Sequence, residues 1–197
     1  MSEPRIFTIK TDVNGRPISL TKRDCKFMAA RAKGMGDEYY SLAKSKIRKS
    51  VELYSDVEAT RVALMGLSSE ILLKSILYDK KIALKASGTR SLIKEHNLFR
   101  LYNLLPSKIQ QAIVVRAEII NELKPSEFKD ILNNISNAFT VQRYCYELFE
   151  VERLYSSMEM IADIIKEISD MYWCESDLRY WNLSSYRSEL KSRLVSR

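Results

Sequence analysis

His96 is the only histidine in this chain of 197 residues, which makes it the obvious candidate for general acid–base chemistry. A histidine at the start of a helical segment is also a common structural polar residue, so both interpretations stay open. The chain has no Gly-rich phosphate loop, no nucleophile elbow and no paired Cys and His ligands. Cys25, Cys145 and Cys174 are far apart, so we expect free thiols in a reducing compartment, no metal and no cofactor.

Two pairs of opposite charges have the spacing that puts both members on one helix face. Glu70 and Lys74 lie inside an apolar run, and Arg143 and Glu147 lie further along the chain. If the fold brings these pairs and His96 together, they form a buried cluster whose charges must be matched. The cluster then serves either to fix the helices or to bind a phosphate or nucleotide, with Arg143 and Lys74 as the anion ligands.

Positive charge is concentrated at the start of the chain. Residues 1–50 contain 12 Lys and Arg against 5 Asp and Glu, and residues 179–197 form a second, smaller basic patch. Such ends indicate contact with a polyanion, most plausibly nucleic acid, although they also fit solvated termini. The expected phosphate contacts are Arg5, Lys10, Arg16, Lys22, Arg23, Lys26, Arg31 and Lys33. Tyr39 and Tyr40 follow them and either stack on unpaired bases or belong to the core.

The elements that must position these residues are helical. Gly and Pro are scarce, and apolar residues recur at helical spacing. Asn14-Gly15 predicts a hairpin or extended arm before Thr21. We expect helices over 21–32, 37–54, 57–84, 96–105, 108–122 and 125–138, with Gly34 and Gly36 separating the first two, and a long last helix from about residue 141. The strongest periodicity predicts a packing seam, within the bundle or across a dimer, at Val151, Leu154, Met158, Ile161, Ile165, Ile168 and Tyr172.

A series of short motifs resembles the HEPN superfamily of small helical bundles found in prokaryotic defence and toxin–antitoxin systems. The motifs are Glu70-Ile-Leu-Leu-Lys74, then Glu95-His96-Asn97-Leu98-Phe99-Arg100-Leu101, then Phe128, Leu132 and Ala138-Phe139, and finally Arg143-Tyr144-Cys145-Tyr146-Glu147. Glu95 and Asn97 stand where this branch usually has Gly and Asp. The resemblance covers about residues 40–172 and implies that Tyr144 belongs with Glu70 and Glu147 in the polar cluster.

Nuclease-active HEPN proteins carry an Arg and a His with four to six residues between them on the last core helix, and two copies of this motif form an RNA-cleaving site in a dimer. No His follows Arg143 in this chain. Arg90 and His96 have the spacing, but they lie at a loop-to-helix junction instead. The resemblance therefore implies Arg90 and His96 as catalytic candidates only if the protein is a metal-independent endoribonuclease.

Together, these features predict an all-α antiparallel helical bundle with a short non-helical or β-hairpin N-terminal arm. We expect a basic arm over 1–35, a HEPN-like bundle over 36–175 and a basic tail over 176–197. No membrane span or signal peptide is apparent, so we expect a cytoplasmic protein. The leading function is RNA or nucleotide recognition, with RNA favoured over DNA, in host defence or phage–host conflict. A homodimer is expected, and a non-enzymatic protein-interaction module is the alternative to RNA recognition.

Overall fold

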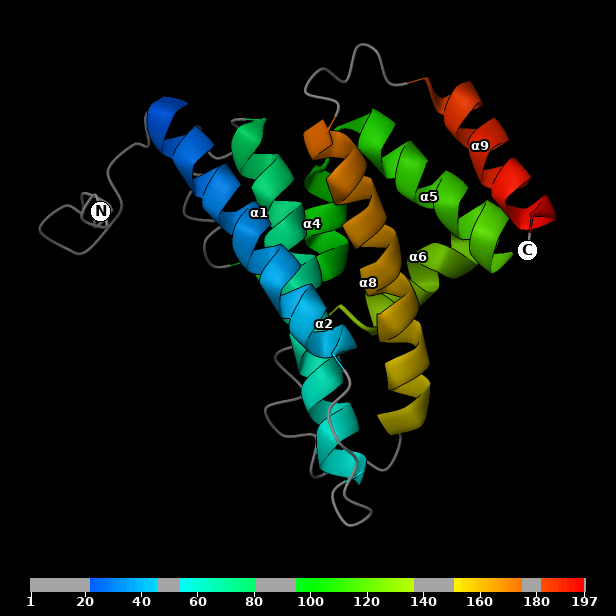
Figure 1. Ribbon diagram of the computed structural model, residues 1–197, viewed down its shortest axis with the longest axis horizontal. Helices are drawn as coiled ribbons and strands as arrows, with labels where there is room; N and C mark the ends of the chain where they lie inside the picture. The colour runs from blue at the N-terminus through cyan, green and yellow to red at the C-terminus, as the bar shows by residue number, and fades with distance from the viewer. Residues whose placement is uncertain (1–21, 46–53, 81–94, 137–150, 175–181, 197) are drawn as a thin grey trace, which may run out of the picture.

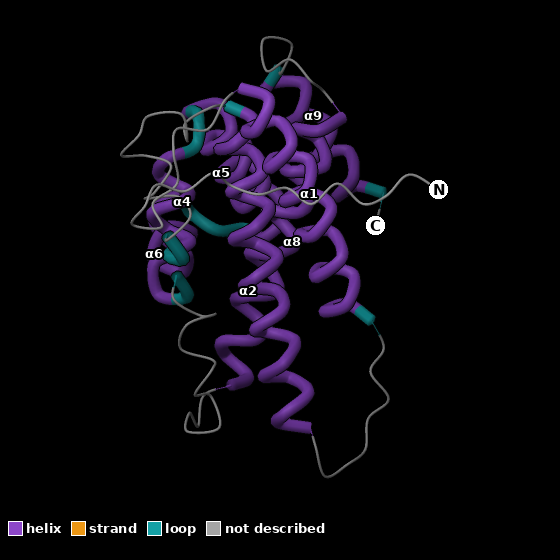
Figure 2. Tube along the Cα trace, turned by 90° about the vertical axis from the view of Figure 1, so that its left-hand side faces the viewer, coloured by secondary structure: helices purple, strands orange, loops and turns teal. Residues whose placement is uncertain are grey.

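The computed structural model describes residues 22–45, 54–80, 95–136, 151–174 and 182–196. These parts of the chain contain helices joined by loops, and no strand is present among them (Figures 1 and 2). The predicted all-α bundle is therefore confirmed. The helices are α1 (Lys22–Lys44), α2 (Tyr54–Asp79), α4 (Leu98–Leu104), α5 (Ser107–Asn121), α6 (Pro125–Asn134), α8 (Val151–Cys174) and α9 (Leu183–Val195).

The first helix passes straight through the two glycines that were expected to stop it. The sequence predicted one helix that ends before Gly34 and a second that begins after Gly36. This prediction was wrong, because α1 is continuous from Lys22 to Lys44. A Cβ atom added at Gly36 would lie 2.7 Å from the Cγ and Cδ2 atoms of Leu72 on α2. Gly36 therefore lets the two helices approach closely, and the packing gained outweighs the roughly 1 kcal/mol that a glycine costs inside a helix.

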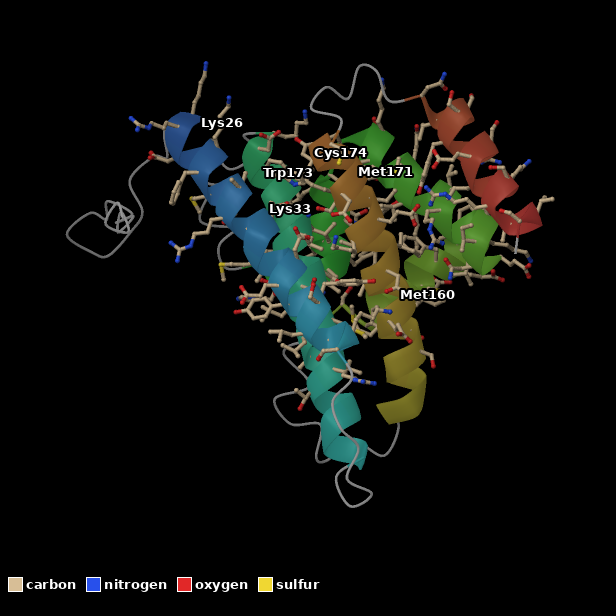
Figure 3. The ribbon with its side chains drawn as sticks, in the orientation of Figure 1. Lys26, Lys33, Met160, Met171, Trp173 and Cys174 are labelled. Carbon is tan, nitrogen blue, oxygen red and sulfur yellow. The ribbon has the colours of Figure 1, made fainter. Side chains whose placement is uncertain are left out.

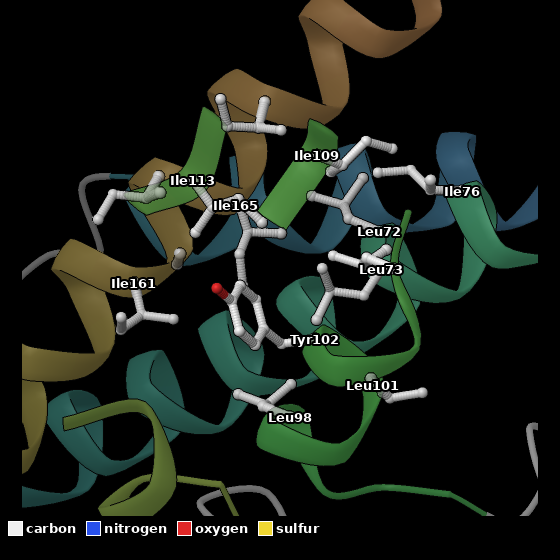
Figure 4. Close-up of a cluster of buried hydrophobic side chains, with 14 of the residues drawn as sticks. Leu72, Leu73, Ile76, Leu98, Leu101, Tyr102, Ile109, Ile113, Ile161 and Ile165 are labelled. Carbon is white, nitrogen blue, oxygen red and sulfur yellow. The ribbon is translucent and has the colours of Figure 1, made fainter. Parts of the chain in front are cut away.

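The second helix is the centre of the bundle. It packs against α1 along most of its length and also contacts α4 and α8. Leucine and isoleucine side chains from α2, α4, α5 and α8 meet in one apolar core (Figure 4). This explains why apolar residues occur around so much of the circumference of α2: the helix has neighbours on several sides. The labelled core residues in Figure 4 are Leu72, Leu73, Ile76, Leu98, Leu101, Tyr102, Ile109, Ile113, Ile161 and Ile165.

The periodic seam on α8 is part of this core. Met158, Ile161, Ile165, Ile168 and Tyr172 are all buried within the single chain. These five seam residues therefore pack inside the bundle and are not available for a dimer contact. Side chains of residues 151–155 lie outside the described set, so Val151 and Leu154 are not placed.

The C-terminal basic residues belong to a helix that sequence reasoning missed. The segment 176–197 was expected to be a tail, but α9 packs along α5 and buries Tyr186 and Leu190 (Figure 1). The boundary expected between residues 35 and 36 likewise falls inside α1. The predicted hairpin before Thr21 and the start of the long helix at about residue 141 lie outside the described residues.

None of the described helices combines the length and apolar character needed to cross a membrane.

Gly34 and Gly36 provide a matched test of the α1–α2 contact. Gly34→Ala should raise the free energy of unfolding by about 1 kcal/mol, because a Cβ there meets nothing within 4 Å and alanine favours helix. Gly36→Ala should lower it by about 1–3 kcal/mol, because the new methyl group overpacks against buried Leu72. Urea unfolding of the two variants measures both signs. Equal stabilisation by both substitutions would contradict this account.

Candidate functional site

A buried carboxylate on α2 connects two of the polar residues singled out in the sequence. The side chain of Glu70 is only 4% exposed, and its Oε1 atom accepts a hydrogen bond of 2.7 Å from Nζ of Lys74. Nδ1 of His96 lies 3.1 Å from Oε1 and 3.2 Å from Oε2 of the same carboxylate. Because an ionised carboxylate only accepts hydrogen bonds, Nδ1 of His96 carries a proton in this contact. The structure thus brings Glu70, Lys74 and His96 together.

The short segment that holds His96 is fixed from several directions. Asn97 caps α4 by accepting a hydrogen bond of 2.9 Å from the backbone N–H of Arg100. The carboxylate of Glu95 accepts the backbone N–H of Asn97 at 2.9 Å, and the hydroxyl of Ser136 accepts that of Phe99 at 3.0 Å. These bonds, with the Glu70–His96 contact, attach the loop before α4 to α2 and to the end of α6. This arrangement gives His96 a structural task.

The other members of the predicted cluster are not placed. Arg143, Tyr144 and Glu147, and the catalytic candidate Arg90, lie outside the described residues. The ring of His96 is half exposed. Lys74 also lines a cavity next to α2, described below, but His96 is not part of that lining. Within the described ranges, no three His, Cys, Asp or Glu side chains are grouped so that they could hold a metal ion.

Four exposed cations lie around the N-terminal half of α1. Lys22, Arg23, Lys26 and Arg31 are all exposed, and none of them forms an ion pair or hydrogen bond with another residue in the part of the chain that the structure describes. Figure 3 shows Lys26 at the outer end of α1. These side chains keep their full charge available to a ligand, so we call them the α1 basic face. This contrasts with the other cations of α1, which are paired.

Lys33 does not belong to the α1 basic face. Its Nζ atom lies 2.5 Å from Asp37 and 2.9 Å from Asp170 on α8, on the side of α1 that is turned toward that helix (Figure 3). The expectation that Lys33 contacts phosphates does not fit this position, because two carboxylates already neutralise it. Tyr40 faces the same way, and its hydroxyl donates a 2.8 Å hydrogen bond to Asp163. Tyr40 is therefore partly buried against α8 and is not presented for base stacking.

The polar contact between α1 and α8 shifts several pKa values. Burial opposes the charges on Lys33 and Asp170, but the hydrogen bonds and charge attraction around them outweigh burial. The pKa of Lys33 is raised and that of Asp170 is lowered as a result. Burial, aided by the hydrogen bond to Asp163, raises the pKa of Tyr40 to about 12. All three groups thus keep their ordinary charge at neutral pH and act as structural ties.

A mainly apolar cavity of about 320 Å³ lies between α1 and α2, next to the α1 basic face. Each helix contributes residues that recur at three- to four-residue spacing, so the cavity follows the groove between the helices for about two turns. Arg31 and Lys74 are its two cationic lining residues. The rest of the lining is Phe27, Met28, Ala32 and Met35 of α1 and Ile71 and Tyr78 of α2.

Tyr78 has an unusual position in this cavity. The residue is 6% exposed, yet its hydroxyl has no hydrogen-bond partner among the described residues. Burial raises its pKa to about 12, with smaller contributions from Cys25 and Glu70, so the hydroxyl remains a proton donor at neutral pH. Its oxygen is not one of the fully buried side-chain atoms that lack a partner, so the hydroxyl is accessible in the cavity and can donate a hydrogen bond to an acceptor atom of a ligand.

Comparison with known proteins adds no family to this picture. No family model matches the chain, and no curated protein or solved structure is similar to it.

Sequence reasoning singled out Glu70, Lys74 and His96, which the structure brings together, but it missed the cavity. Tyr78 and Ile71 were part of an apolar helix, and only the approach of α1 shows which of their faces line a hollow. The available signal was the i,i+4 spacing of Phe27 with Arg31 and of Met28 with Ala32. This spacing puts an aromatic, a cationic and two apolar side chains on neighbouring positions of one side of α1. Ser136, which holds the start of α4, had no signal in its neighbourhood.

Removing Glu70 tests whether the buried charge pair is structural. Glu70→Ala leaves the ammonium group of Lys74, whose side chain is 10% exposed, without its partner, so the free energy of unfolding should fall by about 3 kcal/mol or more. His96→Ala should cost less than about 1 kcal/mol, because that ring is half exposed.

The matched control replaces both members of the pair. Glu70→Leu combined with Lys74→Met should recover most of the stability lost in Glu70→Ala, because the buried charge is removed together with its partner. Chemical unfolding of the three variants and the wild-type chain gives the comparison. A melting temperature unaffected by Glu70→Ala would show that the pair does not hold the fold.

Proposed function

We propose that this protein is a HEPN-like module that recognises single-stranded RNA through the α1 basic face. The observation that supports this most directly is the group of exposed cations at Lys22, Arg23, Lys26 and Arg31, which have no partner among the described residues. Exposed cations without a partner, grouped in the first half of one helix, attract phosphates and release counterions when they bind them. The preference for RNA over DNA, and a role in host defence, come from the resemblance alone.

The neighbourhood of these cations favours a flexible single strand. Phe27 is 42% exposed between Arg23 and Arg31, and the apolar cavity begins at its side. Single strands offer unstacked bases whose flat faces are apolar, whereas a duplex presents its phosphates outward and hides those faces. A surface that mixes cations with an exposed ring therefore suits a single strand better than a duplex.

Charge reversal on α1 tests this proposal. Arg23→Glu with Lys26→Glu should lower the affinity for a single-stranded RNA decamer by about tenfold or more at low salt. It should also reduce the slope of log affinity against log salt by about 1.4, the value for two phosphate contacts on a single strand. Fluorescence anisotropy between about 50 and 200 mM salt measures both quantities.

A matched variant separates a specific surface from net charge. Lys108→Glu with Lys129→Glu makes the same change in net charge on exposed residues of α5 and α6 and should leave the slope unchanged. Point substitutions are preferable to deleting residues 1–35, because that deletion would remove Cys25 and Ala29 from the core. Absence of binding by the full chain, or equal losses in both double variants, would refute the proposal.

Self-association is a second candidate, supported by a different observation. Phe27, Met35 and Leu42 are 42%, 38% and 48% exposed, and they lie on the outward side of α1, where Phe27 and Met35 also border the cavity. Gly34 lies on the same side with nothing within 4 Å of the Cβ position. Large apolar side chains around an exposed helical glycine are typical of a surface that another helix can approach closely.

The order of residues on this side of α1 is self-complementary. An antiparallel copy related by a twofold axis between residues 34 and 35 would place Phe27 opposite Leu42, and Arg31 opposite Glu38. Arg31 and Glu38 are seven residues apart, about 10 Å along the helix, so they do not pair within one chain. Because Phe27 and Arg31 cannot face both RNA and a second copy, the two candidates compete for this surface.

A charge swap decides whether two copies pair in this way. Arg31→Glu alone should reduce the dimer fraction, since it sets two carboxylates opposite each other, and Arg31→Glu with Glu38→Arg should restore it at unchanged net charge. Sedimentation velocity over a range of protein concentrations measures the fraction, with Lys22→Glu as the control. A wild-type chain that stays monomeric, or a swap that fails to restore the dimer, would eliminate this candidate.

A further inference from the structure

The cavity between α1 and α2 combines features that a simple phosphate-binding surface does not need. It is mainly apolar, it lies beside the α1 basic face, and it contains the partnerless hydroxyl of buried Tyr78. A volume of about 320 Å³ is at the lower end of the range for small-ligand sites. We propose that this cavity receives one nucleobase of a bound single-stranded RNA, with the hydroxyl of Tyr78 donating a hydrogen bond to an acceptor on the edge of the base.

The lining fits the two kinds of surface that a base presents. Met28, Ala32, Met35 and Ile71 offer apolar contacts, which suit the faces of an aromatic heterocycle. The edge of every nucleobase carries at least one acceptor. Of the two lining donors that have no partner among the described residues, Arg31 is exposed and Tyr78 is buried, so Tyr78 is the donor suited to the base edge. The cavity therefore suits a nucleobase, which has apolar faces and polar edges.

The cations at the cavity fit the backbone that must accompany the base. Arg31 lines the cavity and is itself exposed, so its guanidinium group can reach a phosphate outside while the base lies inside. Lys74 also lines the cavity, but it is 2.7 Å from Glu70, so its charge is largely matched. A free fatty acid would use the same apolar lining with a single carboxylate, whereas the four exposed cations of α1 favour a ligand with several negative charges.

This inference rests on the proposed function, and two probes separate them. The first probe is a fluorescein-labelled single-stranded RNA decamer, and the second is a decamer of abasic ribose phosphates with the same charge. The wild-type chain should bind the first about tenfold more tightly than the second, since stacking of a base is worth a factor of about 5 to 150. The salt slopes should be equal, because both probes present the same phosphates.

Two variants connect the preference for bases with the cavity. Ala32→Phe fills the cavity and should reduce the affinity for the RNA decamer to that for the abasic decamer, without changing the latter. Ala30→Phe makes the same change on an exposed position of α1 outside the cavity lining and should preserve the tenfold preference. Tyr78→Phe keeps the ring and should reduce the preference about two- to tenfold, the effect of one hydrogen bond. Circular dichroism checks that each variant is folded. If Ala32→Phe does not fold, the effect of Tyr78→Phe on the preference for the RNA decamer tests the base site.

Each contrary result has a distinct meaning. Equal binding of the two decamers with steep salt dependence would overturn the base site and leave RNA recognition by phosphate contacts intact. Failure of both decamers to bind would overturn the proposed function and this inference together. If Ala32→Phe abolished binding of both decamers, or if a fluorescent fatty acid bound and only Ala32→Phe blocked it, the cavity would not be a base site.

Discussion

The close contact between Gly36 of α1 and Leu72 of α2 sets the geometry on which the other features depend. A side chain at residue 36 would push the two helices apart by overlapping the Leu72 side chain, which is buried at the centre of the bundle. With the helices at this distance, α1 buries Cys25, Ala29 and Ala43 against α2 and turns its opposite side outward. The cavity lies between the two helices, so its lining combines residues of both.

A division of labour among the charged residues of α1 follows from the same arrangement. On the flank that faces α8, Lys33, Lys44 and Tyr40 meet acidic side chains and tie the two helices together. On the free side, Arg23 and Arg31 find no partner among the described residues. Charges that hold the fold and charges available to a ligand therefore occupy different positions on one helix. A net charge of +7 can thus coexist with an interface between α1 and α8 in which cations and carboxylates are paired.

The fold class and the Glu70–Lys74 pair could be predicted from the sequence, because helical periodicity and i,i+4 spacing are local properties. The contact of His96 with Glu70, 26 residues away, was expected only on the condition that the fold brought the two together. Features that depend on a neighbouring helix could not. Gly34 and Gly36 look alike in sequence, but only Gly36 faces Leu72, so the helix break predicted there was wrong. Helix α9 was not predicted, because most of its residues are polar or basic and its few apolar positions become recognisable only when they pack on α5.

Mapping the bound RNA onto the chain tests the central claim most directly. Backbone amide resonances of the full-length protein would be followed by NMR during titration with a single-stranded RNA decamer. The account predicts that the largest chemical-shift changes fall on residues 22–35 of α1 and 70–78 of α2, on both sides of the cavity. Changes concentrated on α6 or α9, or confined to the start of α1 with none on α2, would contradict it.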